Sequence, residues 1–123
     1  SIVRLDMLFS ETKYDGVYPI QAYGKNFFRI RGEKINGGIF LYSEILKPWY
    51  GNEDLSFLKE DISLMEILFI GVKEYDHQFQ KNLSKSLNKF GTFVEVLSIP
   101  VACRAYNVSI SGHRKAGVLL EPI

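Results

Sequence analysis

Short segments in which apolar and polar residues alternate fill the first third of the chain and predict antiparallel strands. The alternation places these strands at residues 19–24, 27–31 and 34–42, with glycine-containing turns between them. The third strand is interrupted at Asn36-Gly37-Gly38, where we expect a bulge or a sharp twist.

The second half of the chain shows a different pattern. Residues 66–72 are almost continuously apolar, which is typical of a strand covered on both faces. A helical stripe that begins at Phe79 predicts a helix at residues 77–90, and a strand follows at 92–97. Because a strand–helix–strand unit crosses over, we expect its two strands to be parallel. The remaining expected elements are an irregular connection at 43–52, helices at 54–61 and 100–109, and a last strand at 115–121. Asp54 and Asp76 can cap the helices at 54–61 and 77–90.

These elements together predict an α/β sandwich, in which the antiparallel N-terminal strands form a layer against the βαβ half. A length of 123 residues fits one domain. Residues 1–17 lack periodicity, so we expect an arm that touches the body through Val3, Leu5 and Leu8, and a domain formed by residues 18–123.

The composition excludes several classes of protein. Fifteen basic and fourteen acidic residues leave a net charge of +1, which gives no support for nucleic-acid binding. The chain has one cysteine, which suits a reducing compartment, and no run near the roughly 18 apolar residues of a membrane span. We therefore expect a cytoplasmic protein, or one on the matrix side of a mitochondrion if a leader was removed before Ser1. Peripheral association with a membrane stays open, and the oligomeric state is not determined.

The candidate chemistry lies where the strand at 92–97 leads into the last helix, because ligands of open α/β sheets bind beyond the carboxyl ends of the strands. Cys103 would sit near the start of that helix with Arg104 beside it, an arrangement that favours a thiolate. The alternative is a small buried residue that packs the helix onto the sheet, and this is the stronger interpretation. No histidine is placed by its spacing to act as the base of Cys103.

Arg104 and Asn107 are three residues apart, so we expect them to share a helix face. With Gly71 allowing close approach of the backbone, they would form a cleft for an anion or a peptide terminus. The competing interpretation is that Arg104 pairs with an internal carboxylate and Asn107 ties down a loop. Tyr106 is expected to face away from Arg104, into the core.

No cofactor is indicated by the sequence, because the glycines form neither a dinucleotide-binding nor a phosphate-binding motif and no zinc site is spelled out. Three aromatic residues near predicted connections, Trp49, Tyr50 and Tyr75, are candidates for an interface with another protein. The more conservative interpretation of Trp49 is a lid over an edge of the core.

Several segments, taken in their order and spacing, resemble one known family. They are Ile20-Gln21-Ala22-Tyr23-Gly24, Phe28-Arg29-Ile30, Pro48-Trp49, Ile70-Gly71 and, above all, Ala102-Cys103-Arg104-Ala105-Tyr106-Asn107-Val108. The family is the uncharacterised Mth-type domain family, which includes the mitochondrial complex I assembly factor 3 and the adipogenesis-associated Mth-domain protein. Two positions depart from its pattern: Val72-Lys73 replaces a glycine-containing turn, and Ala105 replaces a threonine.

The resemblance implies a three-layer α/β fold, and it leaves most bacterial members without an assigned function. For the mitochondrial members it implies binding to other proteins, complex I subunits or assembly factors, rather than catalysis, during assembly of the respiratory NADH:ubiquinone oxidoreductase. We therefore expect a protein-binding domain. The alternative is a small enzyme or anion-binding protein that uses the corner of Cys103 and Arg104.

Overall fold

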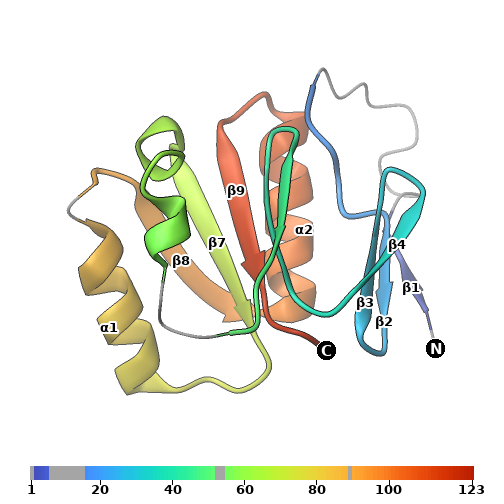
Figure 1. The fold of residues 1–123 in the computed structure, drawn as a ribbon, viewed down its shortest axis with the longest axis horizontal. Coiled ribbons are helices and arrows are strands. Elements are labelled where there is room, and N and C mark those ends of the chain that lie inside the picture. The colour runs from blue at the N-terminus through green and yellow to red at the C-terminus, as the bar shows by residue number, and fades with distance from the viewer. Residues whose placement is uncertain (1, 6–15, 52–54, 89) are drawn as a thin grey trace.

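Two β-sheets and a central helix frame the molecule in the computed structural model, which describes residues 2–5, 16–51, 55–88 and 90–123 (Figure 1). The smaller sheet is antiparallel, with the strand order β1-β2-β3-β4. Its strands are β1 (Val3–Arg4), β2 (Ala22–Gly24), β3 (Phe27–Ile30) and β4 (Glu33–Asn36).

The larger sheet is mixed and has the order β6-β5-β9-β7-β8. Its strands are β5 (Ile39–Tyr42), β6 (Ile45–Pro48), β7 (Ile67–Val72), β8 (Phe93–Ser98) and β9 (Ala116–Leu120). Strand β7 is parallel to both β8 and β9, whereas β5 is antiparallel to β9 and β6. The helix α1 (His77–Asn88) connects β7 to β8, so the expected parallel βαβ unit is confirmed.

Both faces of the larger sheet are covered, and this gives three layers. One face, which includes Phe69 and Val118, packs against the helix α2 (Ile99–Ser111) and the smaller sheet. The other face, which includes Leu68 and Leu119, packs against α1 and two short 3-10 helices, η2 (Ser56–Leu58) and η3 (Ile62–Leu64). Every residue of β7 is buried, as its continuous apolar sequence predicts. The three-layer α/β fold is therefore confirmed.

The predicted strand at 34–42 is wrong in one respect, because it is two strands in two different sheets. The chain leaves the smaller sheet after β4, passes through Gly37 at a φ of 86°, and enters the larger sheet as β5. Gly37 therefore supplies a left-handed backbone, and the expected bulge is a crossing between sheets. The segment after β5, expected to be irregular, forms β6 at the edge of the larger sheet.

Other boundaries are partly confirmed. The expected helix at 54–61 is replaced by η2 and η3, and its expected cap, Asp54, lies outside the described residues. The cap of α1 is confirmed, since Asp76 Oδ1 accepts hydrogen bonds from the amides of Gln78 at 3.0 Å and Phe79 at 3.2 Å. In the expected N-terminal arm, Val3 and Arg4 form β1 and Leu5 is buried, while Leu8 lies outside the described residues.

Candidate functional site

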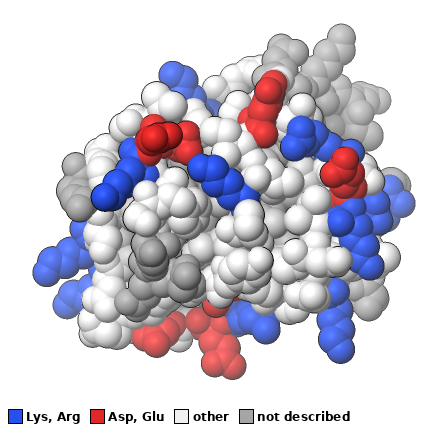
Figure 2. Space-filling view, viewed as in Figure 1, with Lys and Arg blue, Asp and Glu red and all other residues white. Residues whose placement is uncertain are grey.

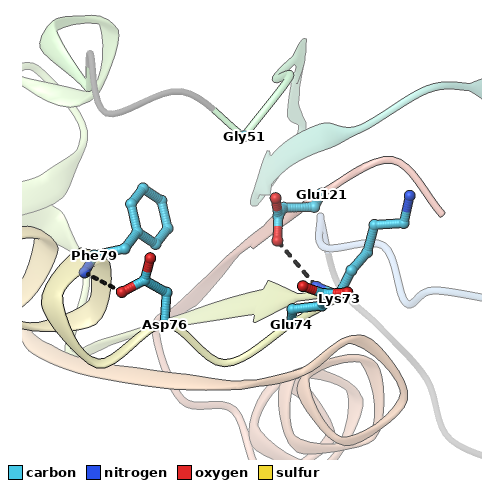
Figure 3. A pocket seen from close by; sticks show the side chains of 6 residues that line it. All are labelled: Gly51, Lys73, Glu74, Asp76, Phe79 and Glu121. Carbon is cyan, nitrogen blue, oxygen red and sulfur yellow. Dashed lines mark hydrogen bonds between the residues drawn. The ribbon is translucent and has the colours of Figure 1, made fainter.

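Two hollows lie at the carboxyl end of β7, the edge at which ligands of α/β sheets bind. The first, the carboxylate-lined cavity, has a volume of about 480 Å³ and contains the side chains drawn in Figure 3. The second, the apolar pocket, has about 220 Å³ and lies where α2 begins, with Ser98, Ile99 and Pro100 in its wall. Lys73, directly after β7, lines both hollows.

Two of the three acidic side chains that line the carboxylate-lined cavity, Asp76 and Glu121, have structural roles (Figure 3). Asp76 caps α1, and Glu121 Oε1 accepts a hydrogen bond from the amide of Lys73 at 2.9 Å. Glu121 also lies against Gly51, where an added Cβ would be 2.8 Å from Glu121 Oε2. Within the ranges that the structure describes, no three His, Cys, Asp or Glu side chains are grouped to hold a metal ion.

Cys103 is a packing residue on the buried side of α2. Its side chain is fully buried in the core between the larger sheet and α2. Burial raises the pKa of the Cys103 thiol from 9.0 to about 12, and the nearby positive charge of Arg104 opposes this rise only in part. The arrangement therefore disfavours the thiolate that a nucleophile needs, and it fits the interpretation of a small buried residue.

We expect Cys103 to react slowly with a thiol reagent in the folded protein, because neither the sulfur nor its ionised form is accessible. The labelling rate at neutral pH should follow the opening of the fold, and it should not rise as a titration near pH 9. The same chain in denaturant, which has this one cysteine, is the reference for full reactivity. Rapid labelling of the folded protein at pH 7 would contradict this.

Asn107 and Tyr106 fasten the segment before β2 to α2. Asn107 Oδ1 accepts a hydrogen bond from the amide of Ile20 at 2.8 Å, and Asn107 Nδ2 donates one to the carbonyl of the same residue at 2.9 Å. The Tyr106 hydroxyl donates to the carbonyl of Tyr18 at 2.7 Å. The expected strand at 19–24 begins only at Ala22, because these side chains satisfy the backbone of the segment before it.

Asn107 and Arg104 therefore do not share an open face, and this expectation is wrong. Asn107 is buried beneath the segment at 18–20, whereas Arg104 is exposed. The core position of Tyr106 is confirmed. Gly71 does not open a cleft either, because an added Cβ would be 2.7 Å from Leu120 Cδ2 and 3.0 Å from Ala102 Cβ. This glycine lets α2 pack closely on β7.

Arg104 faces solvent from residues 102–108 of α2, which carry most of the family resemblance and are called the signature segment here. Within the part of the chain that the structure describes, its guanidinium has no hydrogen bond or ion pair, so the internal carboxylate partner considered above is not found. Val101 and Val108 are exposed on the same side of α2, at 48% and 56%. The sequence analysis missed these two valines, although their spacing of seven residues around Arg104 could have indicated an apolar stripe on the outer face.

The aromatic candidates divide into two groups. Trp49 is only 2% exposed and belongs to the same core cluster as Leu58 and Phe40, a position that favours its role as a lid over the core. Tyr50 and Tyr75 are exposed, at 72% and 64%, and each adjoins a residue that lines the carboxylate-lined cavity. Their role at an interface stays a prediction.

The charged surface gives no sign of a nucleic-acid site on the face shown in Figure 2, where basic and acidic side chains are interspersed around an uncharged centre. Within the described residues, no helix is long and apolar enough to cross a membrane.

Comparison with known proteins gives matches over most of the chain. Residues 20–121 match a family model described as protein of unknown function (DUF498/DUF598). An uncharacterised protein of Rhodobacter capsulatus is 34% identical over 113 residues, which cover 92% of this chain and 91% of that protein.

The name of a second relative states a role in assembly. The NADH dehydrogenase [ubiquinone] 1 alpha subcomplex assembly factor 3 of Xenopus tropicalis is 26% identical over 110 residues, 84% of this chain. The match spans 60% of that protein's length. Among solved structures, a Bordetella pertussis protein described as a Mth938-like domain superposes with a TM-score of 0.72 at 18% identity, covering 89% of each chain. That likeness shows the fold.

Proposed function

We propose that this chain, which belongs to the family described as protein of unknown function (DUF498/DUF598), is a non-catalytic protein-binding domain. It assists assembly of a respiratory NADH:ubiquinone oxidoreductase, the role that is named for its relative, the complex I assembly factor. The observation that carries the proposal is the sequence relation to the assembly factor over 84% of this chain. The partners would be subunits or other assembly factors of that complex.

The signature segment on α2 supports binding rather than catalysis. Its buried members have structural roles: Cys103 packs in the core, and Tyr106 and Asn107 hold the segment at 18–20. Its exposed members are Arg104 and Val108, and exposed Val101 directly precedes the segment; arginine beside apolar groups is common at protein interfaces. The alternative of a small enzyme at this corner would need a reactive Cys103, whose buried thiol has a pKa of about 12.

The test is deletion of the gene in a host that assembles this oxidoreductase. We expect the amount of assembled complex and its NADH:ubiquinone activity to fall together, because incomplete subcomplexes accumulate when an assembly partner is missing. Normal complex levels in the deletion strain would sink the proposal.

Complementation separates binding from catalysis. The wild-type chain and Cys103→Ala should both restore the complex, since a binding domain does not need the sulfur. Restoration by the wild type but not by a folded Cys103→Ala chain would favour the enzyme alternative. Thermal unfolding of the purified variant checks that it folds.

A further inference from the structure

The apolar pocket at the start of α2 has the features of an anchor site. Buried Val72 and Ile99 form part of its wall, together with exposed Pro100 and the half-buried Tyr23 and Ile123. Its volume of about 220 Å³ is below the usual range for a small-molecule site, roughly 300–1,000 Å³, and suits a single large side chain. Interfaces concentrate their binding energy in such anchors.

Positive charge borders this pocket. Lys73 lines it directly, and no ion pair of the Lys73 ammonium is found within the described residues. Arg104 follows Pro100 by four residues on α2, so the two side chains are neighbours on one side of the helix. Its guanidinium is likewise unpaired within the ranges that the structure describes.

Tyr23 links the pocket to Arg104. Burial and the Cys103 thiol raise the pKa of the Tyr23 hydroxyl, and the positive charge of Arg104 acts in the opposite direction. Tyr23 lines the pocket, and Arg104 lies four residues after the pocket residue Pro100, so the guanidinium is near the rim of the pocket without lining it. The acidic side chains Glu74 and Glu121 line the other hollow, the carboxylate-lined cavity.

We infer that the apolar pocket receives a segment of a partner protein that inserts one large apolar side chain and places carboxylates against Arg104 and Lys73. The inference rests on the proposed function, since it names the chemistry of the partner that such a binding domain would recognise. Charge complementarity selects an acidic segment over a basic one, and the pocket fixes its register.

The probes are short synthetic peptides that carry one leucine and two glutamates. In matched peptides, either alanine replaces the leucine or lysines replace the glutamates. The whole ¹⁵N-labelled chain is titrated with each peptide. We expect the leucine–glutamate peptide to shift the amide signals of Lys73, Ser98 and Val101, and each matched peptide to bind at least about tenfold more weakly.

Two variants locate the site on the protein. Arg104→Glu should lower the affinity for the leucine–glutamate peptide by at least about tenfold. Lys85→Glu makes the same charge change at an exposed position of α1 and should leave this affinity within about twofold of the wild-type value. Ser98→Tyr should close the pocket, because Ser98 lines it and makes no capping hydrogen bond that the fold needs. Ser86→Tyr on α1 is its matched control.

Several results would overturn the inference. They are equal binding of the lysine peptide, peptide shifts confined to another surface, no shift at peptide concentrations up to about 1 mM, and an unchanged affinity in Arg104→Glu. Amide shifts at the pocket that depend on the protein's own concentration, without peptide, would show instead that a second copy occupies it.

The deletion strain tests the proposed function separately from the pocket inference. If the wild type restores the complex and folded Ser98→Tyr restores it equally well, the pocket inference fails and the function stands. If the peptide results hold but the deletion leaves the complex at its normal level, the assembly function fails and the pocket remains a binding site.

Discussion

Asn107→Ala should lower the free energy of unfolding by about 3–5 kcal/mol, because it removes two buried hydrogen bonds at once. The amide and the carbonyl of Ile20 would both lose their partner, and each buried group left unsatisfied costs about 1–3 kcal/mol. Ile20 itself is fully buried, so water cannot replace the side chain without opening the core. Urea denaturation of the purified variant measures the loss.

Asn82→Ala is the matched control. Asn82 is exposed on α1, and its Oδ1 accepts a hydrogen bond from Gln78 Nε2 at 2.9 Å. Its replacement should change the free energy of unfolding by no more than about 0.5 kcal/mol. A loss below about 1 kcal/mol in Asn107→Ala would show that the link between α2 and Ile20 is not a major source of stability.

Gly38→Ala should prevent stable folding, because it should lower the free energy of unfolding by at least about 4 kcal/mol. An added Cβ would collide with the carbonyl oxygen of Trp49, and it would lie 2.6 Å from that of Leu120. These atoms belong to backbone on either side of β5, and Trp49 donates its amide to Gly38 O at 3.0 Å. Neither neighbour can move without breaking the sheet, so the strain cannot be relieved locally.

A second glycine separates this clash from ordinary backbone strain. Gly32 has a φ of 76° and nothing within 4 Å of an added Cβ. Gly32→Ala should therefore lower the free energy of unfolding only by the cost of placing alanine in a left-handed backbone conformation, about 1–2 kcal/mol. Thermal unfolding and soluble yield compare the two variants. Similar unfolding temperatures for both would mean that the sheet accommodates a methyl group at Gly38.

The sequence predicted the elements whose pattern is long and regular. The continuous apolar run of β7 and the stripe of α1 are such patterns, and Asp76 marked the start of that helix. The segment at 34–42 was harder, because a glycine pair can mark a bulge within one strand or a crossing between two sheets. Only the packing of Gly38 against neighbouring backbone decides between them. A helix as short as 54–61 is marginal alone, so tertiary packing decides its form.

The sequence indicated where in the fold the candidate site would lie better than it indicated which side chains would be exposed there. The rule for parallel strands located both hollows at the carboxyl end of β7. Helical spacing then put Arg104 and Asn107 on one face, but spacing cannot tell which part of a helix a second sheet covers. The smaller sheet and the segment before it bury Asn107 and leave Arg104 in solvent. The pocket residues Tyr23 and Ile123 come from opposite ends of the chain, and no sequence pattern joins them.

The position of β9 has a consequence for synthesis. This strand lies between β5 and β7 in the larger sheet, yet it follows both of them in the chain by more than forty residues. Until residues 116–120 emerge from the ribosome, no strand joins the β5–β6 pair to the β7–β8 pair, and the edges of β5 and β7 that bind β9 stay unpaired. Completion of the sheet therefore waits until residues 116–120 have been synthesised. Until then the nascent chain is a natural client for a chaperone that shields apolar strands.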